Sequence, residues 1–312
     1  MILLIQYTLI FASVLILVAL GGCFSEHSGV INLGLEGIMV MGALGGALVM
    51  NALSTAPAAV TILVTTLTAG LSGVIYSLLL AVACINVKAD ETLIGTAMNI
   101  LATAAATVIV KAINMASDPD NVSATINYVD AKKAFTVSIG AFNFNWFMLI
   151  ALIALIAAYV LLYKTSFGLR LRACGEHPQA AASVGIDVYK MRWSGVLISG
   201  LLGGIGGIVY ITASVSEWKF ETGVAGFGFL ALAVMIFGDW HPIKIALAAL
   251  LYGFFRALSN VYTGFDWLAS LHISGTVYNM LPYIISLLVL MFTSKNSKAP
   301  KAEGIPYDKG IR

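Results

Sequence analysis

Residues 2–37 read ILLIQYTLIFASVLILVALGGCFSEHSGVINLGLEG, an apolar run followed by a polar, glycine-rich segment. The first half of this stretch, Ile2 to Leu20, is an apolar run long enough for one membrane-spanning helix, which needs about 20 such residues. Its second half is polar and rich in glycine, and another apolar run follows it. Irregular backbone is tolerated at membrane depth only where protein or water covers it. The stretch therefore predicts a helical membrane protein with an interruption near its start.

The composition of the whole chain agrees with a membrane protein. Of 312 residues, 60% are hydrophobic and 10% are charged, whereas a soluble domain is roughly 25% charged. The net charge of +2 does not favour binding to nucleic acid. The cysteines, Cys23, Cys84 and Cys174, lie far apart, so neither a disulfide framework nor a metal site is expected.

Further apolar runs recur along the chain. We expect an all-α polytopic membrane protein with about nine transmembrane helices, which together form one transmembrane domain over residues 1–293. A polar tail, 294–312, follows this domain. The predicted helices lie at roughly 2–20, 32–52, 58–85, 92–113, 146–163, 194–213, 223–238, 243–261 and 277–293.

Basic residues predict the orientation in the membrane. They concentrate in the 164–193 loop and in the 294–312 tail, and loops rich in Lys and Arg stay in the cytoplasm. Four predicted helices separate these segments, so both can lie on one side. The 114–145 loop then lies outside, and counting back over nine helices places the N-terminus outside as well.

A short glycine pattern occurs twice. A Gly-Val pair followed by a glycine and an apolar residue is found at 29–35 and again at 223–229. Each copy opens a predicted helix, and these helices lie five apart in order, so they cross the membrane in opposite directions. This arrangement indicates a possible inverted repeat, with a solute pathway at the repeat interface.

Two polar residues near the first copy are candidates for the pathway. Asn32 and Glu36 are four residues apart and are expected to share a helix face. An acid inside a membrane span is a functional candidate because its burial is costly. Alternatively, Glu36 satisfies the free amides of a broken helix at the cytoplasmic edge.

A polar stripe marks the fourth predicted helix. Thr96, Asn99 and Thr103 recur at spacings of three and four, so they lie on one face that turns toward protein or water rather than lipid. The stripe either lines the solute path or forms hydrogen bonds between helices. Asp90 and Glu91, at the start of the same helix, are explained by the helix dipole alone.

The 164–193 loop contains a short predicted helix. Pro178 suits its first position, Gly185 suits its end, and alanines fill the middle. A helix this short is not stable alone, so it needs a partner surface. Its small side chains and basic flanks favour a docking site over an ordinary connector.

Sequence motifs for ATP hydrolysis are missing. The chain contains no Gly-Lys dipeptide and therefore no phosphate-binding G-x-x-x-x-G-K loop. No clustered catalytic residues are found either. We expect a transport subunit rather than an enzyme, without a cofactor of its own, and ATP is expected to bind to a separate partner chain.

The same motifs carry a family resemblance. The chain resembles permeases of the branched-chain amino acid, ribose and nucleoside group of bacterial ABC importers. Within that group it is most similar to the shorter of the paired permeases in nucleoside systems that depend on a basic membrane lipoprotein. The matching passages are 24–37, 91–99, 175–186, 226–238 and 299–307.

This resemblance implies a set of partners and a location. It implies a second homologous permease subunit, two cytoplasmic ATPase domains, an external lipid-anchored solute-binding protein and the bacterial cytoplasmic (inner) membrane. It also implies that the 176–186 loop is the coupling helix that contacts an ATPase. The residues assigned to coupling are Glu176, His177, Pro178, Ala180, Ala181 and Gly185.

The resemblance implies a nucleoside or a related sugar-containing solute. Arg256 in the eighth predicted helix departs from the neutral or acidic residue expected there, which leaves riboflavin or a simple sugar as alternative solutes. A stand-alone ion-coupled carrier is a further alternative, for which Glu36 and Arg256 would supply the acid and the cation. A membrane-embedded enzyme is another alternative, but no clustered catalytic residues support it.

Overall fold

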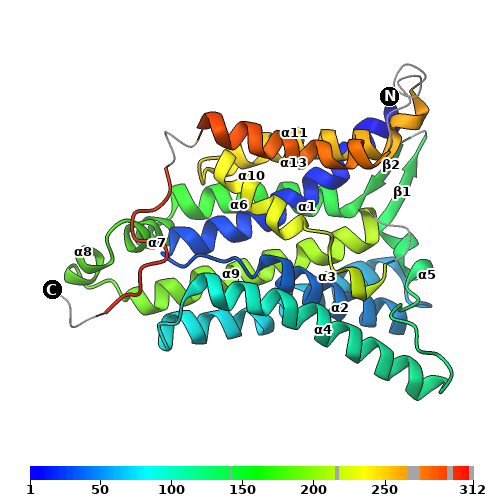
Figure 1. Cartoon of the computed structure of the whole chain (residues 1–312), viewed down its shortest axis with the longest axis horizontal. Helices are drawn as coiled ribbons and strands as arrows, with labels where there is room; N and C mark the ends of the chain where they lie inside the picture. The colour runs from blue at the N-terminus through cyan, green and yellow to red at the C-terminus, as the bar shows by residue number, and fades with distance from the viewer. Residues whose placement is uncertain (141, 215–217, 266–274, 294–297, 309–312) are drawn as a thin grey trace.

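The computed structural model describes residues 1–312 except 141, 215–217, 266–274, 294–297 and 309–312. The chain forms an elongated helical bundle with a small β-hairpin at one end (Figure 1). The helices are α1 (Ile2–His27), α2 (Leu35–Ala52), α3 (Ala58–Leu80), α4 (Glu91–Ser117), α5 (Val129–Lys132), α6 (Trp146–Lys164), α7 (Ser166–Glu176), α8 (Pro178–Ser183), α9 (Val188–Val209), α10 (Phe227–Phe237), α11 (Pro242–Val261) and α13 (Gly275–Thr293).

Short elements extend or join these helices. The helices α3 and α9 continue into π-helical turns at Ala81–Asn86 and Tyr210–Ser214. The hairpin pairs β1 (Thr136–Ile139) with β2 (Phe142–Asn145) in antiparallel register. Single 3-10 turns occur at Lys133–Phe135, Phe220–Thr222 and Tyr262–Gly264.

Seven helices in the described part of the chain are long and apolar enough to cross a membrane. They are α1, α2, α3 with its π-helical end, α4, α6, α9 with its π-helical end, and α11. The prediction of an all-α, multi-pass membrane protein is thus confirmed, but the count of nine spans is not. Within the predicted 223–238 segment, α10 has only 11 residues, which at 1.5 Å per residue reach about half of the ~30 Å hydrocarbon core.

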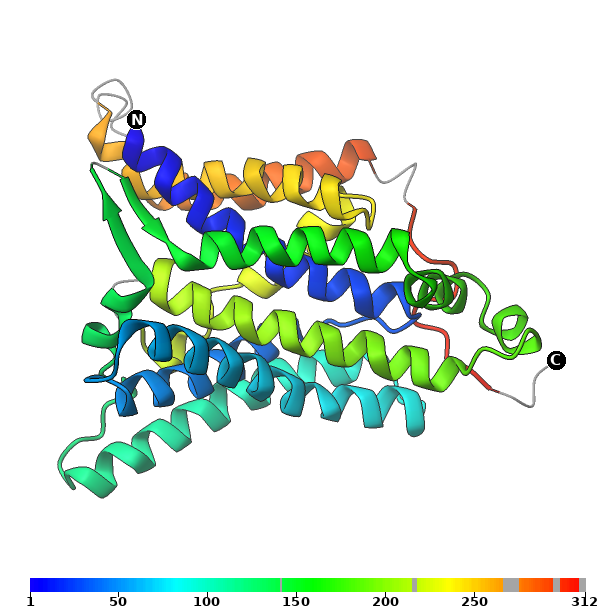
Figure 2. The ribbon, with the colours of Figure 1, turned by 180° about the vertical axis from the view of Figure 1, so that it is seen from behind.

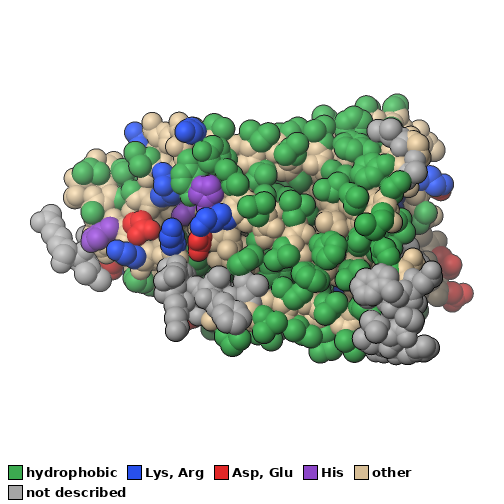
Figure 3. All heavy atoms as spheres, turned by 90° about the horizontal axis from the view of Figure 1, so that it is seen from above, with side chains coloured by type: hydrophobic (Ala, Val, Ile, Leu, Met, Phe, Trp, Pro, Cys, Tyr) green, Lys and Arg blue, Asp and Glu red, His purple; other side chains and the backbone are tan. Residues whose placement is uncertain are grey.

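Apolar side chains cover the outside of the bundle as well as its core. Leu63, Ile100 and Leu247 are 61%, 74% and 64% exposed, whereas Val14 and Leu15 on α1 are fully buried. In Figure 3, hydrophobic side chains cover the middle of one face and charged side chains gather toward its ends. A broad apolar belt between polar ends is the surface that a bilayer requires.

The packing of the helices repeats itself in inverted order. The helices α1 and α9 run in opposite directions and pack together at the centre. The contact of α1 with α11 matches that of α9 with α3, and the contact of α2 with α9 matches that of α10 with α1. The helix α2 packs on α3 and α4 as α10 packs on α11 and α13. This pattern agrees with the inverted repeat predicted from the glycine pattern, while α6 lies outside it, along α1 and α11 (Figure 2).

Glycines allow α9 to lie close to its neighbours. A Cβ atom added at Gly204 would collide with the backbone of Ala69 on α3, and one added at Gly207 would collide with the backbone of Met39 on α2. Small residues at helix crossings let two backbones approach closely inside a membrane. The centre of the bundle therefore depends on these positions.

Replacing Gly204 with valine is expected to prevent stable folding, since the added methyl groups would push α9 away from α3. Overpacking a tight core typically costs about 1–3 kcal/mol. The fraction of monodisperse protein after detergent extraction measures the effect. At Gly264 no atom lies within 4 Å of an added Cβ, so Gly264→Val is the matched control. Equal losses in both variants would contradict the role of Gly204.

The two ends of the bundle differ. The helices α7 and α8 and the C-terminal segment lie at one end, and the N-terminus, α5 and the hairpin lie at the other (Figure 1). The 164–193 loop and the described part of the tail therefore share an end, as the charge distribution predicts. Most of the 114–145 segment lies at the opposite end. Which end faces the cytoplasm stays a prediction.

Candidate functional site

The helix α2 begins inside the bundle, after an irregular segment that follows α1. Residues 28–34 leave the end of α1 and turn back toward the middle, where α2 begins (Figure 1). Gly29 adopts φ +91°, a left-handed conformation that favours glycine. The amide of Ile31 donates to the carboxylate of Glu91 at 2.5 Å. Glu91 therefore holds this irregular backbone in addition to starting α4.

Asn32 ties the same segment to α9. Its side-chain amide donates to the Ser199 hydroxyl at 2.8 Å, and its Oδ1 accepts from the amide of Gly34 at 3.1 Å. Because α2 starts only at Leu35, Asn32 does not share a helix face with Glu36, in contrast to what the spacing predicted. Asn32 is fully buried and holds residues 28–34 against α9.

The short helix α10 also begins inside the bundle, where the amides at its start contact Glu36. Gly226, just before the helix, adopts φ +78°. The amide of Gly226 donates to Glu36 Oε1 at 2.8 Å, and the amide of Gly228 donates to Oε2 at 2.6 Å. Amides at a helix start lack partners within the helix and carry partial positive charge, so a carboxylate stabilises them. Glu36 therefore joins the starts of α2 and α10, and this contact lies inside the bundle rather than at its edge.

A neighbouring long helix also forms hydrogen bonds with the backbone at the start of α2 and of α10. On α4, the Asn99 side-chain amide donates to the Leu33 carbonyl at 2.8 Å, and its Oδ1 accepts from the amide of Gly37 at 2.8 Å. On α13, the Tyr283 hydroxyl donates to the Ala225 carbonyl at 3.1 Å. Since α4 and α13 are equivalent in the inverted packing, the two supports correspond. Sequence reasoning did not identify Tyr283.

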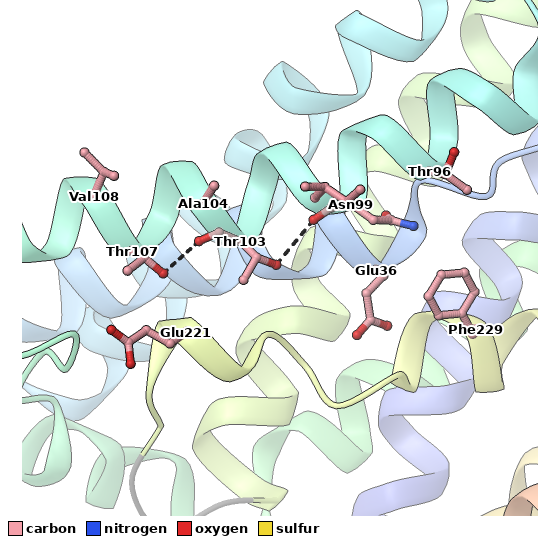
Figure 4. Close-up of a pocket in the computed structure, with 10 residues that line it drawn as sticks. Glu36, Thr96, Asn99, Thr103, Ala104, Thr107, Val108, Glu221 and Phe229 are labelled. Atoms are coloured by element: carbon pink, nitrogen blue, oxygen red, sulfur yellow. Dashed lines mark hydrogen bonds between the residues drawn. The ribbon is translucent and has the colours of Figure 1, made fainter.

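A groove of about 850 Å³ opens where these elements meet. Its size falls in the range of small-molecule sites. In Figure 4, α4 forms one wall, and Glu36, Glu221 and Phe229 lie on the other side. The residues that line the groove are Glu36, Thr96, Asn99, Ile100, Thr103, Ala104, Thr107, Val108, Glu221 and Phe229.

The polar stripe of α4 offers mainly hydrogen-bond acceptors to this groove. The hydroxyl groups of Thr96, Thr103 and Thr107 donate to carbonyl groups one turn back, at 2.8, 3.3 and 2.8 Å. Their oxygen lone pairs remain able to accept. The carboxylate of Glu36 adds acceptor oxygens, while Asn99 uses its donor and its acceptor on backbone groups. Apart from Glu221, the groove is otherwise lined by Ile100, Ala104, Val108 and Phe229, so it combines a mostly apolar wall with a few hydrogen-bond acceptors.

Arg256 lies beside the start of α10. Its guanidinium carbon is 5.5 Å from the ring centroid of Phe227 and 5.9 Å from that of Phe11. A cation this close to aromatic rings is attracted by their electron density. Phe227 stands between the two glycines that donate to Glu36, so Arg256 packs against the same helix start.

The structure brings most of the predicted pathway residues together. Glu36, Thr96, Asn99 and Thr103 line the groove, and Asn32 does not. Six further lining residues were not predicted from the sequence: Ile100, Ala104, Thr107, Val108, Glu221 and Phe229. Thr107 continues the spacing of the stripe and could have been found from it. Glu221 and Phe229 come from the second repeat, and the sequence carries no signal that places them opposite α4.

The segment predicted to couple to an ATPase forms a short helix, α8, at one end of the bundle. Pro178 starts α8, the His177 ring accepts from the amide of Ala180 at 3.2 Å, and Gly185 ends the turn with φ +85°. Of the six predicted coupling residues, Pro178 and Ala181 are buried. The others are exposed: Glu176, His177, Ala180 and Gly185.

The orientation of Ala181 changes the expected docking face. Ala181 is buried in a small cluster with Cys174, Val188 and Tyr307, so a bulky residue there would disrupt packing within the chain rather than block an incoming partner. The surface that supports α8 is therefore part of the same chain. Val184, the residue that follows α8, is 76% exposed.

Comparison with known families identifies the class of this protein. Residues 4–293 match the model of the family described as branched-chain amino acid transport system / permease component, and the chain belongs to this family. It is therefore a transport component rather than an enzyme.

Relatives match over nearly the whole length. The chain is 40% identical over 309 residues to the guanosine ABC transporter permease protein NupQ of Bacillus subtilis, covering 98% of this chain and 96% of NupQ. It is 39% identical over 307 residues to the nucleoside ABC transporter permease protein NupC of Lactococcus lactis, covering 96% and 95%. NupB of the same Lactococcus strain is 28% identical over 138 residues, covering 40% of this chain and 38% of NupB. No solved structure matches the chain.

Proposed function

We propose that this chain is the channel-forming permease subunit of an ATP-driven importer for nucleosides. The main support is the near full-length similarity to NupQ and NupC, permeases named for guanosine and nucleosides. The groove adds physical support because a mostly apolar wall with a few threonine and carboxylate oxygens suits a solute that has an apolar ring face and some hydroxyl or amine donors. A ribonucleoside carries such donors on its sugar and on most bases.

The groove is open on one side, and we propose that a second, homologous permease covers it. NupC and NupB, two nucleoside permeases of one organism, both resemble this chain, which favours a pair of different subunits. Two cytoplasmic ATPases would bind ATP and dock at the α7–α8 end. A lipid-anchored solute-binding protein would deliver solute at the hairpin end. This chain would need no cofactor.

The proposed orientation follows the basic residues. Lys164, Arg170, Arg172, Lys190 and Arg192 lie in or beside the 164–193 loop, and such residues stay in the cytoplasm. The α7–α8 end would then face the cytoplasm of a bacterial cell, the residues after 293 would form a cytoplasmic tail, and residues 114–145 would form the external loop of a domain that spans 1–293.

Cysteine labelling tests this orientation. Lys133 and Lys190 have side chains that are 75% and 80% exposed at opposite ends. In a chain without Cys23, Cys84 and Cys174, Lys133→Cys is expected to react with a membrane-impermeant maleimide in intact cells. Lys190→Cys should react only after the membrane is permeabilised. Labelling of Lys190→Cys in intact cells would contradict the orientation.

Other solute classes are distinguishable by uptake. The putative glucose permease TsgC13 of Haloferax volcanii is 28% identical over 250 residues, so a simple sugar is the second candidate. A stand-alone carrier is less well supported because both oxygens of Glu36 already accept backbone amides.

Uptake of labelled guanosine into cells that express the complete transporter tests the proposal. Unlabelled nucleosides are expected to compete, whereas glucose and riboflavin are not. Competition by glucose alone would favour the sugar permease. Uptake that continues without any ATPase chain would favour the stand-alone carrier.

A further inference from the structure

The described part of the tail, residues 298–308, packs onto the bundle. Ala302 and Tyr307 are 6% and 5% exposed. Polar chain ends are usually poorly ordered unless something ties them down. Here the amide of Ala302 donates to the Gly175 carbonyl at the end of α7, at 2.8 Å. Arg192 on α9, which is 1% exposed, donates to the Ile305 carbonyl at 2.8 Å.

Tyr307 supplies part of the surface on which α8 rests. Its ring lies 5.4 Å from that of Tyr189 and forms a small cluster with Cys174, Ala181 and Val188. The helix α8 has only six residues and cannot be stable without such contacts. Tyr307 therefore helps to fix the orientation of α8.

The same segment also reaches residues 28–34, the irregular segment before α2. The backbone oxygen of Ala302 lies beside Gly29, and Gly304 lies against the side chain of Ile31. Farther along, Asp308 forms an ion pair of 2.8 Å with Lys88, in the connection between α3 and α4. Residues 28–34 include Asn32 and lead to Glu36 in the first turn of α2. The segment thus contacts both α8 and the backbone that leads to the groove.

We infer that residues 298–308 form a clasp that couples α7 and α8 to the interrupted segment 28–34, so that movement at α8 reaches the groove. This inference rests on the proposed function, because it assumes that a partner ATPase moves α8. Within this role Tyr307 is a positioning residue. Coupling between distant sites needs a contiguous element that both sites contact, and the clasp meets this condition through Tyr307 at one end and Gly304 at the other.

The native Cys174 reports whether the clasp is closed. Its thiol is fully buried in the Tyr307 cluster, and burial raises the pKa of Cys174 to about 11. Maleimides react with the thiolate, so labelling should be slow. With Cys23 and Cys84 replaced by alanine, Tyr307→Ala and a chain ending at residue 297 are expected to label Cys174 at least about tenfold faster, because removing the cover exposes the thiol and lowers its pKa.

Two variants control this labelling experiment. Tyr307→Phe keeps the ring, and Ile305→Ala removes a side chain that is 54% exposed but keeps the carbonyl that Arg192 binds. Both should label as slowly as the unchanged chain. Equal protection of Cys174 in the shortened chain would overturn the clasp itself.

The coupling role is tested in the assembled transporter by the amount of solute imported per ATP hydrolysed. Tyr307→Ala is expected to lower this ratio at least about fivefold, roughly 1 kcal/mol of coupling, while the ATPase still copurifies. Tyr307→Phe should restore it. An unchanged ratio, or a loss of copurified ATPase in proportion to uptake, would overturn the coupling role. If the unchanged chain imports no solute with ATP, the proposed function fails, and the Cys174 experiment still decides the clasp.

Discussion

Replacing Glu36 with leucine is expected to abolish uptake. The change removes both acceptors from the amides of Gly226 and Gly228 and leaves two donors unpaired at the start of α10. Each unpaired buried group costs about 1–3 kcal/mol, and the favourable charge at the helix start is lost as well. The starts of α2 and α10 would separate, and the groove between them would lose its shape. Uptake should fall by at least about a hundredfold, the factor that 2.7 kcal/mol represents.

Glu36→Gln is the matched variant for this position. It keeps one oxygen acceptor and the side-chain volume but presents an amide to the second donor, so its uptake should lie between those of the unchanged chain and Glu36→Leu. Uptake is measured per assembled complex, quantified by copurification of the second permease. Normal uptake by Glu36→Leu would show that transport does not need the contact between the starts of α2 and α10.

The second large effect is expected for Asn99→Leu. This change leaves the Leu33 carbonyl and the Gly37 amide without their partner on α4. At about 1–3 kcal/mol for each group, the start of α2 should loosen, and uptake per assembled complex should fall at least about tenfold.

Asn99→Asp and Thr107→Val separate support from solute contact. The aspartate keeps an acceptor for Gly37 and loses the donor to Leu33, so it should retain partial uptake. Thr107 lines the groove without holding backbone of another helix, so Thr107→Val should alter solute preference more than assembly. If uptake and assembly fall in proportion in Asn99→Leu, Asn99 is a purely structural residue.

The features that could be predicted from the sequence are those that depend on local chemistry. Apolar runs identified the helices, because a spanning helix must be apolar on its lipid face. Pro178 and Gly185 marked both ends of α8, since each residue has a strong backbone preference. The repeated glycine pattern indicated the inverted packing because glycine also has a distinctive backbone preference.

Contacts between distant segments could not be predicted. The donors to Glu36 lie 190 and 192 residues away in the chain. No local sequence pattern indicates that Glu36 binds these amides. Ala181 is buried in a cluster that includes Tyr307, which is far away in the sequence. The tail illustrates the same limit: its polar composition indicates exposure, but Ala302 and Tyr307 are buried because the end of the bundle offers matching backbone partners.

ATP-driven nucleoside import is tested by ATP hydrolysis and guanosine uptake by the purified complete transporter in lipid vesicles, with and without guanosine and the solute-binding protein. We expect guanosine to stimulate hydrolysis and labelled guanosine to accumulate against its gradient only with ATP, and we expect the Glu36→Leu complex to do neither. Accumulation without ATP, or hydrolysis and transport that respond to glucose and not to guanosine, would contradict ATP-driven nucleoside import.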